Sequence, residues 1–417
     1  MSLAALRLPG LHPESMSRRI IPLVPAAASS APGASPLLAP PPLALYVHFP
    51  WCLRKCPYCD FNSHAPHGDE IPFAAWVDAI VADLEAALPQ IWGRRVHSIF
   101  IGGGTPSLLP PPALENLLNA VRARLSLAPG AEITLEANPG AVASARFRDY
   151  RDAGITRLSL GIQSFDDAAL LRIGRIHNGL EARRAIESAL AWFERINLDL
   201  MYALPGQTPD AALADVETAL GFGTGHLSCY HLTVEPNTPF AHSPPVLPDD
   251  DIAADMQEMI EARLTAAGFE HYEVSAFARP GQHCRHNLNY WTFGDYLGLG
   301  PGAHGKLTTP AGVLREARHK HPARYLEGAQ RGDFIQERRT VTAAELPFEF
   351  MMNALRLTNG VPAPMFVERT GLPLSTVEPE FSTAHRLGLL DANPAHLQPT
   401  PKGRLFLNDL LQIFLPG

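Results

Sequence analysis

The sequence predicts an α/β protein built on a partial (β/α)6 barrel, with a small and mainly helical domain after it. From residue 43 to about residue 231, short β-rich apolar runs alternate with longer amphipathic helical patterns. Such alternation is typical of βα units around a parallel sheet. Six of these units fall short of the eight that close a full barrel. Beyond about residue 340 the helical patterns become short and no longer alternate with strands.

The predicted strands are short runs rich in β-branched and aromatic residues. They span Leu43–Phe49, Ser98–Ile101, Ile133–Ala137, Arg157–Ile162, Asn197–Tyr202 and His226–Leu232. The clearest helices between them have apolar residues at steps of three and four, and they span Pro72–Leu88, Pro112–Leu125 and Leu180–Arg195. A further helix is predicted at Asp249–Ala267, before a stretch rich in Gly, His and aromatic residues that runs to about residue 305.

The first 43 residues differ from the rest of the chain. Nine of them are proline, and Ala, Ser and Gly make up much of the remainder, so we expect a disordered tail over residues 1–43. Arg18 and Arg19 precede apolar residues, as in a twin-arginine export signal. Prolines interrupt that apolar run almost at once, and we therefore expect no export.

The remaining boundaries follow from changes in pattern. We expect the barrel and an aromatic motif region over residues 44–305, a linker over residues 306–340, and a C-terminal domain over residues 341–417. Helices in that last domain are predicted at Ala343–Leu357, Pro362–Thr370, Leu374–Leu389 and Pro401–Phe414. Its last 73 residues carry five Lys/Arg and seven Asp/Glu, which is the wrong sign for nucleic-acid binding. A lid or docking role is favoured.

Composition excludes several other classes of protein. Hydrophobic content of 46% and charged content of 18% describe an ordinary globular chain. A net charge of −8 provides no field that would attract nucleic acid or acidic lipid. Five cysteines suggest no disulfide framework, and no apolar stretch approaches the length of a transmembrane helix. We expect a cytoplasmic protein.

Three of the five cysteines lie within eight residues, at Cys52, Cys56 and Cys59. A structural zinc site would need a fourth ligand, usually from a second Cys or His pair, and no such pair follows. Three thiolates at this spacing suit a [4Fe–4S] cluster with one open iron, since an electron-transfer cluster takes four cysteines. An open iron is a place where a cofactor can bind.

Unusual polar or glycine residues follow the other predicted strands. In a barrel the working residues sit at the C-terminal ends of the strands, and here five successive ends supply such groups. They are the cysteine loop, the run Gly102, Gly103, Gly104 and Thr105, then Glu136, Gln163 and Asp199. Glycine lets backbone groups approach a ligand without interference from a Cβ atom. Taken singly, the glycines could form an ordinary loop and the carboxylates could cap helices.

A second motif spans His283 to Trp291, with the core His286-Asn287-x-x-Tyr290-Trp291. Imidazole and thiolate are usual axial ligands of haem iron, and aromatic rings can pack on a porphyrin. His286 could be the ligand, with Cys284 and His304 as alternatives. Taken alone, these residues favour a loop whose Tyr and Trp anchor the core, and the haem interpretation rests on the family resemblance given below. We expect the glycine-rich segment from Gly294 to Gly305 to be a loop that closes over the cofactor mouth.

The cysteine motif CxxxCxxC with its aromatic neighbours resembles the radical S-adenosylmethionine (SAM) superfamily. The wider stretch resembles the subgroup related to HemN, the oxygen-independent coproporphyrinogen III oxidase. Within this subgroup the run from Cys56 to His64 and the HNxxYW motif are similar to the HemW family of haem chaperones. The oxidase pattern has a further cysteine where this chain has Phe61, a departure that counts against decarboxylation. The resemblance covers about nine-tenths of the chain.

The resemblance implies a radical SAM barrel and a winged-helix-like C-terminal domain. It also implies roles for the residues at the strand ends. Cys52, Cys56 and Cys59 would hold the cluster, Gly103 and Gly104 would meet the SAM amino group, and Glu136 and Asp199 its ribose and amino groups. The cofactor-binding residues it implies are Tyr46, Tyr58, Gly103, Gly104, Thr105, Glu136, Gln163, Arg175, Asp199, His286, Tyr290 and Trp291.

The function that the resemblance implies is that of a haem chaperone with three cofactors: a [4Fe–4S] cluster, SAM and haem. The implied partner is a haem acceptor, expected to be a respiratory haem protein, with membrane contact only through that partner. The alternative is an oxygen-independent coproporphyrinogen III oxidase in porphyrin biosynthesis. A zinc protein without redox function is a third hypothesis. No segment predicts the oligomeric state, so a homodimer stays open.

Overall fold

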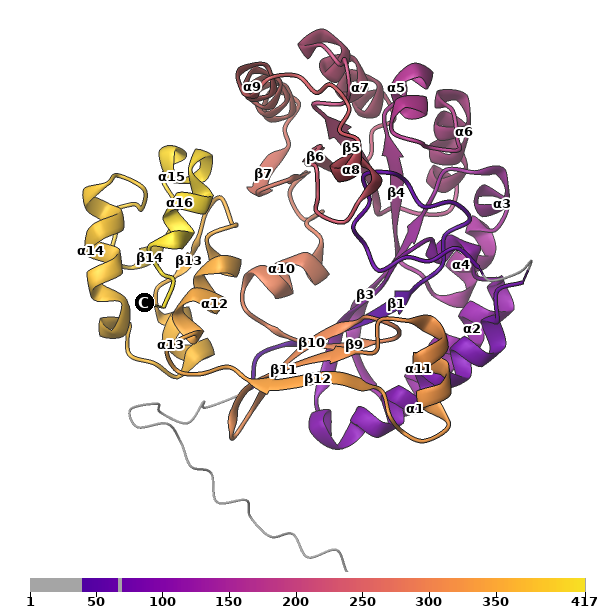
Figure 1. The fold of residues 1–417 in the computed structure, drawn as a ribbon, viewed down its shortest axis with the longest axis horizontal. Coiled ribbons are helices and arrows are strands. Elements are labelled where there is room, and N and C mark those ends of the chain that lie inside the picture. Colours follow the sequence, from indigo (N-terminus) through magenta and orange to yellow (C-terminus); the bar gives the residue numbers. More distant parts are fainter. Residues whose placement is uncertain (1–39, 67–69, 417) are drawn as a thin grey trace, which may run out of the picture.

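The computed structural model describes residues 40–66 and 70–416, and Figure 1 shows a barrel beside a smaller helical domain. The expected disordered tail spans residues 1–43. Its residues 1–39, which include Arg18 and Arg19, lie outside the described part of the chain. Among the described residues no helix is both long and apolar enough to span a membrane.

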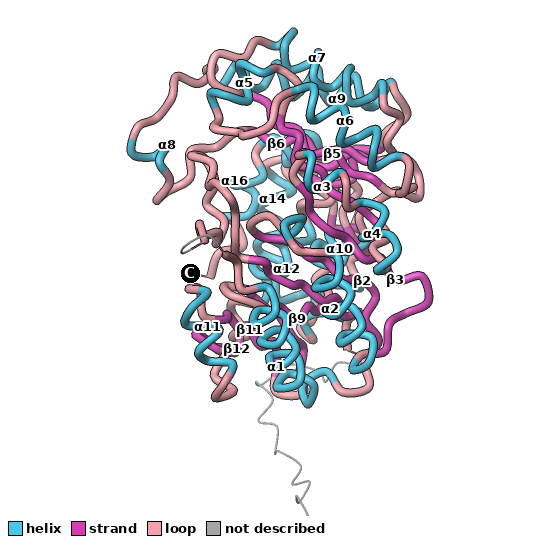
Figure 2. The backbone as a smooth tube through the Cα atoms, turned by 90° about the vertical axis from the view of Figure 1, so that its right-hand side faces the viewer, coloured by secondary structure: helices cyan, strands magenta, loops and turns pink. Residues whose placement is uncertain are grey.

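The prediction of a partial (β/α)6 barrel is confirmed. Six strands pair in parallel and in chain order. They are β1 (Leu43–Phe49), β2 (Arg95–Gly103), β3 (Ser126–Ala137), β4 (Arg157–Gln163), β5 (Ile196–Tyr202) and β6 (His226–His231). Helices cover their outer face (Figures 1 and 2), and these are α1 (Phe73–Ile91), α2 (Pro111–Arg124), α3 (Ala141–Ser144), α4 (Phe147–Ala153), α5 (Asp167–Arg172), α6 (Gly179–Leu190), α7 (Pro209–Gly221) and α9 (Asp250–Ala266). The short η1 (Pro106–Leu108) follows β2, and α8 (Pro239–His242) lies apart from this layer, where Phe240 N donates to Pro57 O of the cysteine loop at 3.1 Å.

The alternation of side chains along each strand explains why these segments form a barrel. In β1, Leu43, Leu45 and Val47 enter the large core that α1 and α2 share. The intervening Tyr46 and His48 instead line an internal cavity. Because successive side chains of a strand point to opposite faces, one face of the sheet is apolar and the other is left for polar groups.

Further strands extend the sheet at both ends. Beside β1 lie β9 (Asp295–Leu299), β10 (His304–Thr309), β11 (Gly312–Arg318) and β12 (Ile335–Thr340), and beside β6 lie β8 (Ala276–Ala278) and β7 (Glu270–Glu273). These end strands, β12 and β7, do not pair with each other in the described residues, so the sheet is open. Helix α11 (Pro322–Ala329) connects β11 to β12.

Two sequence predictions are wrong at this edge. Residues 306–340 are not a linker, because they form β11, β12, α11 and most of β10. Nor is the segment from Gly294 to Gly305 a loop throughout, because it contains β9, which pairs in parallel with β1. Its glycines allow close packing: a Cβ atom on Gly298 would lie 2.0 Å from the backbone oxygen of His304. The glycine pattern that suggested a loop therefore permits a strand.

The aromatic motif forms the short helix α10 (Arg285–Trp291), which lies between the barrel and the C-terminal domain (Figure 1). It contacts β1, β2 and β9 on one side and α12 (Leu346–Ala354) on the other. The partly buried Leu288 and Trp291 of this helix pack against the core of the C-terminal domain.

The C-terminal domain has its own apolar core, which includes Phe350, Phe366 and Phe381. Its predicted helices are present, although the third and fourth are each divided. Beside α12 they are α13 (Pro364–Thr370), η2 (Leu374–Val377), α14 (Glu378–Arg386), α15 (Pro401–Leu405) and α16 (Leu407–Gln412), with a small sheet of β13 (Val361–Pro362) and β14 (His396–Leu397).

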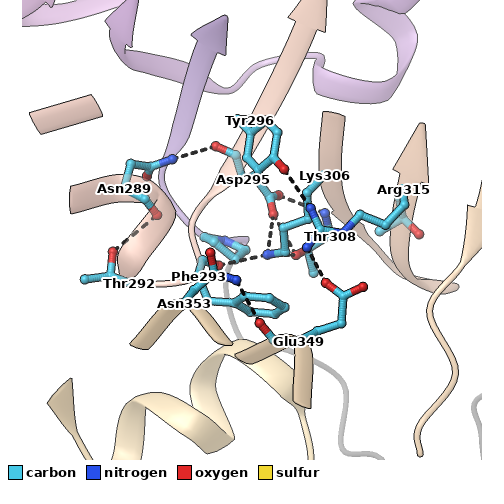
Figure 3. A network of polar contacts seen from close by, with 12 residues as sticks. Asn289, Thr292, Phe293, Asp295, Tyr296, Lys306, Thr308, Arg315, Glu349 and Asn353 are labelled. Carbon is cyan, nitrogen blue, oxygen red and sulfur yellow. Dashed lines mark hydrogen bonds and ion pairs between the residues drawn. The ribbon is translucent and has the colours of Figure 1, made fainter. Parts of the chain in front are cut away.

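A buried ion pair lies at the edge of the barrel sheet, next to the C-terminal domain (Figure 3). Asp295, at the start of β9, is fully buried, and its carboxylate accepts from Lys306 Nζ at 3.1 Å and Arg94 Nη1 at 2.7 Å. The backbone N–H of Thr308 donates to the same carboxylate at 2.9 Å. Burial lowers the pKa of Lys306 to about 8, although the charge of Asp295 opposes this shift.

The network continues into the C-terminal domain. Lys306 also donates to the carbonyl of Phe293 at 2.8 Å, directly after α10. Arg315 of β11 donates to Tyr296 Oη at 2.7 Å and forms an ion pair with Glu349 of α12. One set of polar contacts therefore joins the sheet edge, the end of α10 and the C-terminal domain.

We expect Asp295→Ala to lower the free energy of unfolding by about 3–5 kcal/mol, because it leaves Lys306 buried without its partner. Urea unfolding monitored by circular dichroism measures this change. The matched control is Asp78→Ala at an exposed site of α1, which should change stability by less than about 0.5 kcal/mol. Equal stability of the two variants would contradict a structural role for the ion pair.

Candidate functional site

The cysteine loop follows β1 and is held at both ends by backbone hydrogen bonds. Cys52 N donates to His64 O at 3.0 Å, and His64 N donates to Pro50 O at 2.7 Å. Two of the sulfurs accept from polar side chains: Thr105 Oγ1 lies 3.3 Å from Cys52 Sγ, and Arg175 Nη1 lies 3.7 Å from Cys56 Sγ. Burial raises the pKa of the Cys52 and Cys59 thiols, so binding of a metal centre there would release protons.

The spacing of the three sulfurs distinguishes between kinds of metal site. Among the described residues, no three His, Cys, Asp or Glu side chains are close enough together to hold one metal ion. A zinc ion needs its ligands within about 2.3 Å of one point, whereas a [4Fe–4S] cluster takes its thiolates on separate irons. Three thiols that line one cavity are compatible with such a cluster.

That cavity has a volume of about 330 Å³ and lies at the C-terminal ends of the barrel strands. It brings together most of the residues that the sequence singled out. Its lining includes Cys52, Cys56, Tyr58, Cys59, Gly103, Gly104, Thr105, Glu136, Gln163, Arg175 and Asp199. Segments separated by almost 150 residues in the chain thus meet, as expected where parallel strands share a rim.

The glycines after β2 are required by the close approach of the cysteine loop. Gly103 has φ +117°, and a Cβ atom there would lie 2.6 Å from the His48 ring. A Cβ atom on Gly104 would lie 2.5 Å from Trp51 O. Gly104 N donates to Phe49 O at 2.7 Å and Thr105 N donates to Trp51 O at 2.8 Å. The glycine run therefore allows both loops to form one wall of the cavity.

Two carboxylates, from strands on either side of β4, face the same cavity. Glu136 of β3 accepts from Gly103 N at 3.1 Å, and Asp199 of β5 accepts from Ser159 Oγ at 3.0 Å and from Asn197 Nδ2 at 2.8 Å. Burial, and then the charge of Asp199, raises the pKa of Glu136 to about 8. Burial also raises the pKa of Asp199. A positively charged ligand placed between them would remove this repulsion.

Arg175 reaches the cavity from the loop after α5. Its Nη2 donates to Gly161 O at 2.6 Å and to Asn138 Oδ1 at 2.9 Å, while its Nε is buried and has no partner among the residues that the structure describes. Gln163, at the end of β4, has φ +67°, a conformation that costs energy for a residue with a side chain. An unpaired guanidinium N–H and a strained strand end are both typical of a ligand site.

Sequence reasoning missed Asn138, which also lines this cavity. Its Nδ2 donates to Thr105 Oγ1 at 3.2 Å, so it connects Arg175 to the residue that contacts Cys52. Asn138 comes directly after the end of β3, and the strand-end argument could have found it.

A second and larger cavity of about 1000 Å³ adjoins the first. The two share the lining residues Phe61, Gly103 and Glu136, among others. Tyr46, Tyr290 and Trp291 line this larger cavity, as do Tyr296 of β9, His304 of β10 and Asn353 of α12. It therefore lies between the barrel mouth, α10 and the C-terminal domain.

His286 does not line either cavity. Its side chain is 1% exposed and stacks on Phe100 at 5.0 Å. Both ring nitrogens are engaged, Nδ1 with Ser98 Oγ and Nε2 with Tyr290 Oη, each at 3.0 Å. Burial lowers its pKa to about 3, so the ring is neutral. Cys284 is also fully buried, and its Sγ donates to Glu132 Oε1 at 3.7 Å.

Comparisons with known proteins agree with this geometry. Residues 46–219 match the family model of the radical SAM superfamily, and residues 341–406 match that of the HemN C-terminal domain. The chain is 50% identical over 377 residues to heme chaperone HemW of Escherichia coli, which covers 90% of the chain and 98% of the relative. HemW of Haemophilus influenzae is 48% identical, with the same coverage.

Among solved structures, coproporphyrinogen III oxidase (HemN) of Escherichia coli has a similar fold. The TM-score is 0.76 at 22% sequence identity, with 90% of each chain covered. At this level of identity the likeness establishes the fold alone. It confirms the expected barrel and C-terminal domain.

The raised pKa of Glu136 predicts how stability varies with pH. Glu136 binds a proton up to about pH 8 in the folded chain, against 4.5 as its usual value. Its contribution to stability is therefore complete below pH 4.5 and is lost as pH rises to about 8, with a slope of up to about 1.4 kcal/mol per pH unit. Glu136→Gln should flatten this decline in cluster-free protein, as measured by urea unfolding at several pH values.

The control for this experiment is Glu115→Gln, at an exposed site of α2. It should keep the pH profile of the unchanged chain. If Glu136→Gln also kept that profile, the protonation of Glu136 in the folded chain would be ruled out.

Proposed function

The chain belongs to the HemW family of heme chaperones within the radical SAM superfamily, and from this membership we propose that it binds a [4Fe–4S] cluster, SAM and haem, and transfers haem to an acceptor protein. The observation that supports this most directly is that two cavities adjoin at the barrel mouth. The smaller one has the thiols and carboxylates that a cluster and SAM require. The larger one has the volume and the aromatic lining that suit a porphyrin.

The residues of the smaller cavity fit the cluster and SAM. Cys52, Cys56 and Cys59 would hold the cluster, which supplies one-electron reduction of the SAM sulfonium when both are bound. Glu136 and Asp199 offer acceptors for the ribose hydroxyls or the ammonium group of SAM, and their raised pKa values favour a cationic ligand. Arg175 has an unpaired N–H and suits a carboxylate partner.

Haem is the cargo in this proposal and occupies the larger cavity. The rings of Tyr290 and Tyr296 meet edge to face at 4.4 Å, and Trp291 lies beside them on α10. Lys320 also lines this cavity and offers a positive charge to the propionates. Anaerobic reconstitution followed by haem titration should give a chain that carries cluster and haem together, and mixing with an apo haem protein should transfer the haem.

The acceptor proposed for this chain is a respiratory haem protein, which would also provide its only contact with the membrane. All five cysteines are free, in keeping with a cytoplasmic location. A homodimer is compatible with the proposal but is not required by it.

A coproporphyrinogen III oxidase remains the second candidate because its fold matches over most of the chain. Against it stands Phe61, which occupies the place of the oxidase's additional cysteine, and whose 58% exposed ring lines both cavities. Incubation with reductant, SAM and coproporphyrinogen III under anaerobic conditions decides between the two. Formation of protoporphyrinogen would overturn the chaperone proposal.

Each of Cys52→Ser, Cys56→Ser and Cys59→Ser should abolish the brown absorbance of the cluster, because a site with three thiolates has no spare ligand. Iron and sulfide analysis of anaerobically reconstituted protein measures this loss. Cys229→Ser is the matched control, since Cys229 is buried in β6 among the core residues. Full iron content in any of the three loop variants would refute the cluster assignment.

A further inference from the structure

The larger cavity contains histidines that could coordinate the haem iron, and this inference rests on the proposed function. His48, His64 and His304 line it. An axial ligand must present a ring nitrogen with a free lone pair toward the iron. The hydrogen bonds of the three rings therefore indicate which histidine has a nitrogen available to coordinate iron.

His286, the ligand expected from the sequence motif, lacks this property. It does not line the cavity, and both of its nitrogens are hydrogen-bonded inside the barrel. Coordination by His286 would require breaking its bonds to Ser98 and Tyr290 and moving the ring out of its contact with Phe100. Each of these buried polar groups would then be left unpaired, at a cost of about 1–3 kcal/mol.

Two of the cavity histidines are also engaged. His48 is buried; its Nε2 donates to Asn62 O at 2.8 Å, and its Nδ1 accepts from Tyr46 Oη at 2.9 Å. His64 Nε2 donates to Asn62 Oδ1 at 3.2 Å, and its ring packs against His321 at 5.5 Å. Both nitrogens of His48 are therefore engaged, and coordination by His64 would disturb the contacts that its ring makes with Asn62 and His321 beside the cysteine loop.

His304 differs from both. It is the first residue of β10, its side chain is exposed, and in the described part of the chain its ring has no hydrogen-bond partner. We propose that His304 is the axial ligand of haem in the larger cavity, where it stands with Tyr290, Trp291 and Tyr296 on the lining. The HNxxYW motif then supplies the aromatic wall of the haem site through Tyr290 and Trp291, while His286 fixes the helix that carries them.

The electrostatic surroundings agree with this assignment. Burial and then the charges of Lys320 and Arg315 lower the pKa of His304, although Glu337 opposes them. The ring is therefore neutral near pH 7, which is the form that coordinates iron. Lys320 lines the same cavity and is placed to meet a propionate on the side of the porphyrin near His304.

The test is haem titration of the full-length reconstituted chain, with absorption and electron paramagnetic resonance spectra of the ferric complex. His304→Ala should weaken haem binding by at least about ten-fold and shift the Soret band, since loss of an axial ligand changes the field at iron. His304→Cys should recover binding with the distinct spectrum of thiolate ligation. A merely structural role for His304 would not produce that spectrum.

Two controls keep the outcomes distinct. His97→Ala removes an exposed histidine near the start of β2, at the opposite end of the barrel from the cavities, and should bind haem as the unchanged chain does. His286→Gln should keep the position of the Soret band even where haem binds more weakly, because the ring positions α10 and is not the ligand. In every variant the cluster absorbance, which depends on a separate loop, reports that the barrel is folded.

Each possible result has a definite meaning. If the unchanged chain bound no haem, the proposed function itself would fail. If it bound haem but His304→Ala kept its spectrum and affinity, the function would stand and the assignment of His304 would be wrong. A lost band in His286→Gln together with an unchanged band in His304→Ala would return the ligand to α10.

Discussion

A polar lumen that must satisfy its own hydrogen bonds is the constraint on which this structure depends. Asp199 of the smaller cavity accepts from Asn197 Nδ2, and Asn197 Oδ1 meets His226 Nδ1 at 2.6 Å. The other nitrogen of His226 meets Tyr272 Oη at 2.9 Å, and Tyr272 in turn accepts from Cys284 N at 3.3 Å. One arrangement of the hydrogens gives each donor in this series an acceptor. In that arrangement His226 is neutral, in agreement with its strongly lowered pKa. These hydrogen bonds run from the Asp199 carboxylate to the start of α10.

This constraint explains the two parts of the aromatic motif. Where a short helix packs into the open side of a barrel, its polar groups must form hydrogen bonds with the polar groups that face the inside of the barrel. His286 does so through Ser98 and Tyr290, and the backbone of Arg285 does so through Glu132 Oε1 at 2.9 Å. Tyr290 and Trp291 follow on the same helix and reach the larger cavity. A histidine in a binding motif can thus serve to position the residues that contact the ligand.

Predictions that rested on local pattern succeeded, and those that needed distant contacts did not. Strand ends and side-chain alternation are local, so the cysteine loop, Glu136, Gln163 and Asp199 were found before the structure. The glycines of β9 suggested a loop, because nothing near Gly298 in the sequence shows that the β10 backbone approaches it. Likewise Ser98, one of the two hydrogen-bond partners of His286, lies on β2, almost 190 residues away, and this contact, which helps to hold the ring away from the cavity, is invisible in the motif.

The Asp295 junction has a consequence for the larger cavity, because three separate regions of the chain form its walls. Phe61 comes from the cysteine loop, His304 from β10 and Asn353 from α12. Lys306 ties β10 to β9 through Asp295, and Arg315 of the adjacent β11 joins this sheet edge to α12 through Glu349. A ligand that fills the cavity would contact all three regions. The free energy of its binding therefore depends on how stably the junction holds these regions together. The wall that α12 contributes to the cavity therefore depends on the ion pair between Arg315 of β11 and Glu349.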